Sequence, residues 1–379
     1  IERYDLKFVP FVPPPGPQLG SPDGGFSLIR RENIMIHLPY DSFMPVVEFL
    51  KNAARDPDVL AIKQTLYRAG QNSPVVQALL EARRDFGKQV AVLVELKARF
   101  DEESNIGWAK VLEAEGVHVI YGLVGLKTHS KIALVVRKEG ERIRRYVHLG
   151  TGNYNAITAH LYEDLGMFTS DQDIGADATD LFNFLTGYST KEDYRKLWIA
   201  PVNLRRKMGE SIRREIEHKK AGRPARLIFK MNSLVDKPMI TLLYEASQAG
   251  VEIDLLVRGI CCMRPGIPGV SDNIRVVSIV GRYLEHSRIY YFSNGGKEEI
   301  YMGSADLMPR NLNRRVEVIF PVEDPKHIRY IRDVVLNIYL ADNLKARIMK
   351  PDGSYEFIQP EHGQERVSSQ QTFLNMRIK

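Results

Sequence analysis

The sequence predicts an α/β fold with two similar units, each a mixed β-sheet flanked by helices. Short apolar segments alternate with segments of helical period along most of the 379 residues, and this alternation is typical of helices layered on a sheet. The order of elements then recurs in the second half of the chain. Each half also carries a histidine followed two residues later by a cation. At roughly 150 residues per domain, the length suits two or three domains.

In the first half, strands and helices are predicted in alternation. Residues 90–94 read Val-Ala-Val-Leu-Val, a continuous apolar run of the length of a buried strand. The other segments have either this character or the apolar period of a helix. The predicted elements are a helix over residues 42–54, a strand over 59–66, a helix over 73–85, a strand over 89–95, a helix over 105–115 and a strand over 117–121.

The pattern starts again near residue 226. Residues 227–232 resemble residues 60–65, and a helix over 238–248 and a strand over 251–257 are predicted to follow. Between Arg205 and Arg226 there are nine basic and three acidic residues, which indicates either a solvated linking helix or a surface that attracts polyanions. We therefore predict a linker over residues 1–32, a first domain over 33–190, a charged helical connector over 191–225 and a second domain over 226–379.

The first 25 residues are rich in Pro and Gly, a composition typical of an extended linker. The chain opens on Ile1 rather than Met. We therefore expect these residues to be the remnant of an upstream region that this sequence does not include.

The composition excludes several classes of protein. The hydrophobic share of 44% and the charged share of 26% exclude disorder, collagen-like repetition and a disulfide scaffold. The net charge of +6 is below that of a protein that coats DNA, so no nucleic-acid partner is predicted, but it fits a phosphate compound. The two cysteines, Cys261 and Cys262, are adjacent and rarely pair, which favours a reduced, cytoplasmic protein. No apolar run approaches about 18 residues, so no transmembrane segment is predicted.

Two matching motifs carry the predicted chemistry. They are His129-Ser130-Lys131 and His286-Ser287-Arg288, and each opens a short apolar strand. Residues i and i+2 of a strand share a face, so we expect each histidine to lie beside a cation. Such a cation neutralises the oxygens of a phosphoryl group while the imidazole attacks phosphorus or protonates the leaving oxygen. We predict His129, Lys131, His286 and Arg288 to be catalytic.

Each half also has a turn of small residues after its motif, over residues 150–153 and 303–306. Such turns let backbone N–H groups approach a phosphate closely. A single His-x-Lys occurs by chance, but two copies at matching places in a duplicated chain indicate an active site.

This two-copy pattern resembles the phospholipase D superfamily, in which two such histidines meet at the interface of twin domains. That superfamily has an Asp a few residues beyond the lysine, whereas the matching stretch here is apolar. The second copy also carries Arg288 in place of Lys. Arginine keeps the charge and adds a planar fork suited to phosphate oxygens. Both departures argue against phosphodiester cleavage.

A longer pattern is more specific. Its segments are NIMIHLPYDSF (33–43), IKQTLYR (62–68), VELKARFDEE (94–103), GLKTH (125–129) and SADLMPRN (304–311). Together they resemble the C-terminal half of the bacterial polyphosphate kinases of the long, phosphohistidine-forming family. The resemblance implies reversible transfer of the γ-phosphate of ATP to inorganic polyphosphate through a phosphohistidine.

The resemblance also implies roles for single residues. His129 would become phosphorylated, and His286 would be a second active-site histidine that contacts the nucleotide phosphates. Tyr162 and Arg258 match positions that contact the nucleotide, although Tyr162 is equally well explained as a core aromatic.

Arg68 and Arg99 match positions around a magnesium ion. An arginine has no lone pair to offer a metal, so we interpret both as phosphate clamps beside a Mg²⁺–nucleotide complex; surface ion pairs are the alternative. The acidic residues 101–103 suit either Mg²⁺ contacts or the first turn of a helix. Polyphosphate-lining candidates are Arg310, Arg314 and Arg315.

The expected ligands are thus ATP or ADP, polyphosphate and Mg²⁺. By the same resemblance, the full-length protein is expected to form a homo-oligomer and to associate peripherally with the inner membrane. Two other functions stay open: a phospholipase-D-like phosphodiesterase or nuclease, and a non-catalytic fragment that binds polyanions. The second is kept because the N-terminal half of the family, which contributes to nucleotide binding, is absent from this sequence.

Overall fold

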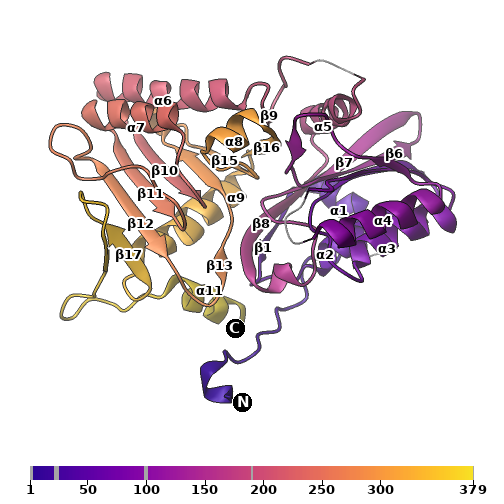
Figure 1. Cartoon of the computed structure of the whole chain (residues 1–379), viewed down its shortest axis with the longest axis horizontal. Helices are drawn as coiled ribbons and strands as arrows, with labels where there is room; N and C mark the ends of the chain where they lie inside the picture. Colours follow the sequence, from indigo (N-terminus) through magenta and orange to yellow (C-terminus); the bar gives the residue numbers. More distant parts are fainter. Residues whose placement is uncertain (1–2, 21–24, 98–100, 189–190, 379) are drawn as a thin grey trace.

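The computed structural model describes residues 3–20, 25–97, 101–188 and 191–378. Two mixed β-sheets lie side by side, one from each half of the chain, and helices pack against both (Figure 1). This arrangement confirms the predicted α/β fold with two similar units.

The first sheet has the strand order β1-β8-β7-β6-β2-β3-β4. Strands β2, β3 and β4 are parallel, and their neighbours are antiparallel. Helices α2 and α3 bury apolar residues against one face, and α5 buries residues against the other. The elements are α1 (Phe26–Arg31), β1 (Ile34–Leu38), α2 (Met44–Arg55), β2 (Val59–Leu66), α3 (Pro74–Arg84), β3 (Gln89–Val94), α4 (Glu102–Ala114), β4 (His118–Ile120), β6 (Ile132–Glu139), β7 (Arg142–Gly150), β8 (Tyr162–Thr169) and α5 (Gln172–Leu185), with short 3₁₀ helices at Tyr4–Leu6 and Thr158–His160.

The second sheet has the order β18-β17-β12-β11-β10-β14-β15-β16, and β9 pairs with β16. Helices α6 and α7 lie along one face of this sheet (Figure 1). The elements are β9 (Trp198–Ala200), α6 (Leu204–Lys220), β10 (Arg226–Met231), α7 (Lys237–Gln248), β11 (Glu252–Val257), β12 (Ile274–Ile279), β14 (Ile289–Phe292), β15 (Glu299–Gly303), α8 (Pro309–Asn313), β16 (Arg315–Val322), α9 (Pro325–Arg329), α10 (Asn337–Ala341), β17 (Ala346–Met349), β18 (Tyr355–Phe357) and α11 (Ser369–Ile378), with a 3₁₀ turn at Asn294–Gly296 and a π-helical segment at Tyr330–Leu336.

The two halves exchange short strands. Strand β5 (Lys127–Thr128) comes from the first half but pairs in parallel with β16 of the second sheet. Strand β13 (Leu284–Glu285) comes from the second half but pairs in parallel with β8 of the first sheet. Each exchanged strand directly precedes one of the two histidine motifs. The exchange therefore carries each histidine across to the other unit.

A shared apolar core lies between the sheets. One cluster of buried side chains includes Leu134 and Leu149 of the first sheet together with Ile289 and Met302 of the second. Phe373 of the C-terminal helix α11 belongs to the same cluster. Each fully buried large apolar side chain contributes roughly 1.5–3 kcal/mol. This core holds the two units, and hence the two histidines, in a fixed relation.

Most predicted elements agree with the structure to within two residues, but the predicted linker over residues 1–32 contains helix α1 and the predicted helical connector over 191–225 contains strand β9. The strand predicted over residues 59–66 coincides with β2, whereas the helix predicted over 105–115 begins earlier, at Glu102. Neither histidine motif lies within a strand, because β6 begins at Ile132 and β14 at Ile289. The exchanged strands end one residue before each histidine, so each motif occupies the segment between two paired strands.

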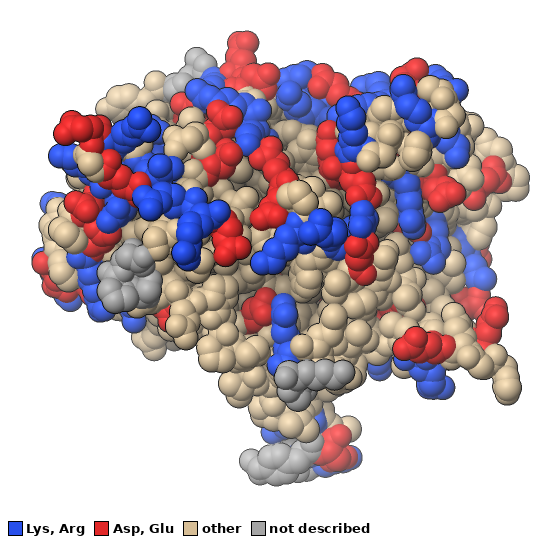
Figure 2. Space-filling model, turned by 180° about the vertical axis from the view of Figure 1, so that it is seen from behind, with Lys and Arg blue, Asp and Glu red and all other residues tan. Residues whose placement is uncertain are grey.

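Helix α6 contains most of the positive charge of residues 205–226. Its apolar side, including Met208 and Ile212, is buried on the second sheet. Several of its cations form ion pairs, such as Arg205 with Asp236 at 2.8 Å. On the face that Figure 2 shows, cationic and anionic side chains are mixed. Much of the positive charge counted in the sequence is therefore paired locally.

The two cysteines form no disulfide, and the described helices are short or polar. Cys261 and Cys262 are both free thiols. Within the described residues, no helix combines the length and the apolar character that crossing a membrane requires.

Candidate active site

His129 lies where the first half of the chain meets the second sheet. Its backbone N–H donates to the carbonyl of Val316, next to the pairing of β5 with β16. Its Nδ1 lies 2.9 Å from Oε2 of Glu317, whose side chain is fully buried. Ser304 and Asn311 donate hydrogen bonds to the same carboxylate. The carboxylate that faces His129 is thus held in place by neighbours of its own.

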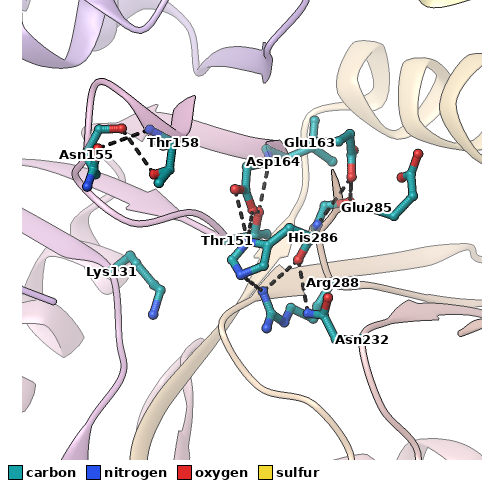
Figure 3. A network of polar contacts seen from close by, with 12 residues as sticks. Lys131, Thr151, Asn155, Thr158, Glu163, Asp164, Asn232, Glu285, His286 and Arg288 are labelled. Atoms are coloured by element: carbon teal, nitrogen blue, oxygen red, sulfur yellow. Dashed lines mark hydrogen bonds and ion pairs between the residues drawn. The ribbon is translucent and has the colours of Figure 1, made fainter. Parts of the chain in front are cut away.

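His286 has a matching environment at the first sheet. Its backbone N–H donates to the carbonyl of Glu163, next to the pairing of β13 with β8. Its Nδ1 lies 2.8 Å from Oδ1 of Asp164, and the hydroxyl of Thr151 donates to that oxygen at 2.6 Å. Figure 3 shows His286 between this carboxylate and the cation of its own motif.

Each histidine is therefore oriented by a carboxylate from the other half of the chain. Glu317 is the third residue of β16, and Asp164 is the third residue of β8. The hydroxyl donors Ser304 and Thr151 directly follow β15 and β7, in the turns predicted to approach phosphate. The two carboxylates were not predicted from the sequence, and the two hydroxyls were predicted only as members of turns that approach phosphate. The available signal was a carboxylate at the same position of two matching strands.

The residues predicted to be catalytic come together here. Nζ of Lys131 donates to the carbonyl of His129. Arg288 reaches back to its own histidine, with Nη1 3.2 Å from Nε2 of His286, and forms an ion pair with Asp306 at 3.3 Å.

Burial sets the protonation of both histidines. It lowers the pKa of His129 well below its usual value, and nearby cations, including Arg288 of the second motif, add to the effect. Burial also lowers the pKa of His286; Asp164 opposes this change and Lys131 of the first motif adds to it. Each motif thus acts on the histidine of the other, so both face one site. Both rings are neutral at pH 7.

The two histidines differ in the contacts of Nε2, the ring nitrogen that does not face a carboxylate. In each ring Nδ1 faces a carboxylate, so the single proton of the neutral ring is assigned to Nδ1 and the lone pair to Nε2. Nε2 of His286 accepts a hydrogen bond from Arg288. Among the described residues, Nε2 of His129 has no hydrogen-bond partner. A neutral imidazole with an unshared Nε2 is suited to nucleophilic attack.

A third buried histidine, His148, predicts how stability depends on pH. Burial lowers its pKa to about 3, while the unfolded chain takes up the proton near pH 6.5. The unfolded state therefore binds more protons below pH 6.5, and stability falls as the pH falls through that range. We expect His148→Asn to reduce this loss by up to about 1.4 kcal/mol per pH unit. Urea unfolding of the wild type and of His148→Asn at pH 7 and pH 5 measures the loss of stability between the two pH values. Equal losses in the two proteins would contradict the prediction.

The two residues predicted to contact the nucleotide lie beside His286. The ring centroid of Tyr162 is 5.2 Å from that of His286. Arg258, directly after β11, donates to the carbonyl of Glu285 at 2.6 Å and to Oδ1 of Asn232 at 3.0 Å. The structure thus brings Tyr162, Arg258 and His286 into one cluster. Their contacts with a nucleotide stay a prediction.

Arg68 lies after β2 in an unusual backbone conformation. Its φ of 56° is in the left-handed region, which residues other than glycine rarely adopt and which is enriched at functional sites. Its carbonyl accepts from Nδ2 of Asn155 at 2.9 Å, and its Nε lies 3.7 Å from Asp101. The second predicted phosphate clamp, Arg99, lies outside the described residues.

Tyr67 gathers cations next to His129. Its ring centroid is 5.1 Å from that of His129. Nζ of Lys131 and of Lys127 lie 5.0 and 5.4 Å from the same centroid, and the guanidinium of Arg68 lies at 5.3 Å. Aromatic rings attract cations, so Tyr67 stabilises several like charges beside the predicted nucleophile. Neither Tyr67 nor Lys127 was singled out from the sequence.

The donor set of the site bears on the expected magnesium ion. Within the described ranges, no three His, Cys, Asp or Glu side chains are grouped so that they could hold a metal. Asp101 is engaged with Arg68, and a guanidinium has no lone pair for a metal. These residues do not fit an ion held by the protein alone. They are compatible with Mg²⁺ that arrives on substrate phosphates, its usual carrier in phosphoryl-transfer sites.

Two family models match nearly the whole chain. The model of the polyphosphate kinase C-terminal domain 1 matches residues 25–191, and that of the C-terminal domain 2 matches residues 197–370. The chain belongs to the polyphosphate kinase family. It is 55% identical over 377 residues to polyphosphate kinase 1 of Chlorobaculum tepidum, and 59% identical over 354 residues to a polyphosphate kinase of Synechocystis.

The chain spans about half the length of these polyphosphate kinases. The two matches cover 100% and 93% of this chain, but 53% and 48% of the relatives. The crystal structure of polyphosphate kinase from Porphyromonas gingivalis is similar with a TM-score of 0.90 at 40% identity, and covers 98% of this chain and 56% of that one. A phosphatidylserine synthase of Haemophilus influenzae matches over 83% of this chain and 87% of that one, with a TM-score of 0.55 at 9% identity, which shows a shared fold alone.

Three arginines were predicted from the sequence to line polyphosphate, namely Arg310, Arg314 and Arg315. Nη1 of Arg315 lies 3.9 Å from Oε1 of Glu317, and so belongs to the surroundings of His129. The carbonyl of Arg314 accepts from the backbone of Lys127. Arg310 lies in α8 and is exposed. The structure places Arg315 in the site, while contacts of all three arginines with polyphosphate stay a prediction.

Proposed function

We propose that the protein carrying this chain transfers the γ-phosphate of ATP reversibly to inorganic polyphosphate, with His129 as the residue that is phosphorylated. The observation that carries the proposal is the difference between the Nε2 atoms of the two histidines. Nε2 of His286 is engaged by Arg288, whereas Nε2 of His129 has no hydrogen-bond partner among the described residues. Family membership supports the reaction class.

In the first step, the lone pair on Nε2 of His129 attacks the γ-phosphorus of ATP. The Nε2–P bond forms as the bond from phosphorus to the β–γ bridging oxygen breaks, and ADP leaves. The Nδ1 proton stays between His129 and Glu317, whose negative charge offsets the positive charge that develops on the ring. Lys131 and Arg288 offset the charge on the transferring phosphoryl oxygens.

In the second step, a terminal oxygen of polyphosphate attacks the same phosphorus and the Nε2–P bond breaks. His129 returns to its neutral form, and the polymer is one unit longer. His286, Tyr162 and Arg258 form the nucleotide side of the site in this proposal. Mg²⁺ would be carried by the nucleotide phosphates and would neutralise part of their charge. A homo-oligomeric state and a cytoplasmic location with attachment to the inner membrane stay predictions.

The test is to label the full-length protein with γ-labelled ATP and Mg²⁺, and to map the label by peptide mass spectrometry. We expect label that is stable in alkali, is lost in acid and lies on the peptide with His129. Added polyphosphate should remove the label and yield a longer polymer. Absence of label, or label confined to another residue, would refute the phosphohistidine; label that water alone removes would favour a diesterase.

A further inference from the structure

The two histidine motifs are anchored differently at their central serine. The hydroxyl of Ser287 donates to Glu163, with its oxygen 2.7 Å from Oε2, and accepts from Nζ of Lys230 at 2.8 Å. The backbone N–H of Ser287 also donates to Oε2 of Glu163, at 3.2 Å. The hydroxyl of Ser130 in the first motif is buried, and among the described residues it has no hydrogen-bond partner. The serine beside His286 is therefore fixed by two buried charges, and the serine beside His129 is not.

The residues that make this difference occupy equivalent places in the two halves. Glu163 directly precedes Asp164, as Val316 directly precedes Glu317. Lys230 pairs with Ile289, three residues beyond His286. In the first sheet Gln64 pairs with Ala133, so Thr65 lies opposite Ile132, three residues beyond His129. The hydroxyl of Thr65 accepts from the backbone N–H of Ile132 at 3.2 Å. The counterparts of Glu163 and Lys230 are therefore Val316 and Thr65, and the sequence match of Lys230 with Lys63 was two residues out of register.

The buried pair belongs to a larger polar cluster. Nζ of Lys230 lies 2.6 Å from Glu163 and 3.0 Å from Glu285, and it also lies over the ring of Tyr339. Oε1 of Glu163 lies 3.0 Å from Nε2 of His37. Although burial opposes charge on both residues, Glu163 and Glu285 together raise the pKa of Lys230, and Lys230 is the largest influence that lowers the pKa of Glu163. Both therefore stay charged in the interior.

Keeping an ammonium and two carboxylates in the interior costs free energy that an apolar cluster would not. Among the residues that the structure describes, the first half of the chain has no such cluster beside its own histidine motif. Because this cost is borne only at the second motif, we expect the buried charges to have a role that is specific to that motif. Ser287 lies between His286 and Arg288 in the chain, so any shift of its backbone displaces both neighbours.

We propose that Lys230 and Glu163 are positioning residues that hold His286 and Arg288 toward the nucleotide phosphates through the Ser287 hydroxyl. This inference rests on the proposed function, because it assigns the nucleotide side of the site to His286. Positioning matters strongly in phosphoryl transfer, where a displacement of about 1 Å can cost about 100-fold in rate. The first motif needs no such anchor, because His129 acts by its own nucleophilicity.

The test compares Ser287→Ala with the matched control Ser130→Ala in the full-length protein. Both changes remove one buried hydroxyl and leave Lys230 paired with its carboxylates. A hydrogen bond to a charged group supports about a tenfold change in an equilibrium. We therefore expect Ser287→Ala to raise the KM for ADP, and to slow discharge of the phosphoenzyme to ADP, by about tenfold. Discharge to polyphosphate should change less than about twofold, and Ser130→Ala should leave both reactions within about twofold.

The outcomes separate this inference from the proposed function. If the wild type forms no phosphoenzyme, the proposed function itself is wrong. If the wild type is active but both variants respond alike, or Ser287→Ala slows both discharges equally, the positioning role is wrong. A lower melting temperature of Ser287→Ala with unchanged kinetics shows a purely structural serine, and also overturns the inference.

Discussion

Replacing Glu317 with Gln is expected to slow phosphorylation of His129 by about 10²- to 10⁴-fold, the range seen when a carboxylate behind a functional histidine is lost or becomes an amide. The carboxylate accepts the Nδ1 proton of His129 across 2.9 Å. A Gln side chain can turn its amide N–H toward Nδ1, which leaves the lone pair there and moves the ring proton to Nε2. The nucleophile would then present N–H to the γ-phosphate, and it could not attack.

Single-turnover labelling with γ-labelled ATP measures this effect. His129→Ala gives the background level of labelling. A melting temperature of Glu317→Gln close to that of the wild type shows that this variant keeps the fold. Asp164→Asn is the matched control, because Asp164 holds Nδ1 of the other histidine at 2.8 Å. We expect it to impair nucleotide-dependent steps and to leave discharge to polyphosphate less affected. If Glu317→Gln were labelled at the wild-type rate, Glu317 would not set the tautomer of the His129 ring.

Replacing Lys230 with Met is expected to destabilise the protein by about 3–5 kcal/mol. Lys230 is nearly inaccessible and lies between two carboxylates, at 2.6 Å from Glu163 and 3.0 Å from Glu285. Removal of the cation leaves both carboxylates in the interior without the ammonium that lies between them, and Glu163 keeps, among the described residues, only its neutral donors and His37 at 3.0 Å. Met fills a similar volume, so the lost stability is caused by the uncompensated charges rather than by a cavity.

Urea unfolding at pH 7 measures the loss, and two further variants test its cause. Lys63→Met changes the lysine that the sequence match aligned with Lys230. Lys63 is partly exposed, so we expect a change within about 1 kcal/mol. Adding Glu163→Gln to Lys230→Met removes one of the two uncompensated buried charges. The double variant should therefore recover part of the lost free energy of unfolding. Equal destabilisation by Lys230→Met and Lys63→Met would show that the buried charges are not the cause.

Much of the fold could be predicted because its signals are local. The apolar run over residues 90–94 became part of β3, and the strand predicted over 59–66 coincides with β2. Helix ends were less certain, since α4 begins at Glu102 rather than near residue 105. Short exchanged strands such as β5 have only two residues. A pair of residues carries no periodicity, so no sequence pattern could have indicated that they cross to the other sheet.

The candidate site shows the same division. The two motifs stood out from the sequence because a histidine, a serine and a cation recur together in a duplicated chain. Their partners did not, because Glu317 lies 188 residues from His129, and Asp164 lies 122 residues from His286. Lys230 illustrates a different limit. Similar letters aligned it with Lys63, whereas the registers of the two sheets, with Lys230 opposite Ile289 and Gln64 opposite Ala133, make Thr65 its counterpart.

The sequence by itself determined the class of fold, the duplication, the two histidine–cation motifs and membership of the polyphosphate kinase family. Each of these depends on residues that are close together in the chain, or on whole segments that can be compared. The tertiary structure alone decided that each histidine is oriented by the other half, and that Nε2 of His129, unlike that of His286, has no hydrogen-bond partner in the part of the chain that the structure describes. The physical reason is the exchange of β5 and β13, because long-range strand pairing sets which side chains meet and local sequence does not encode it.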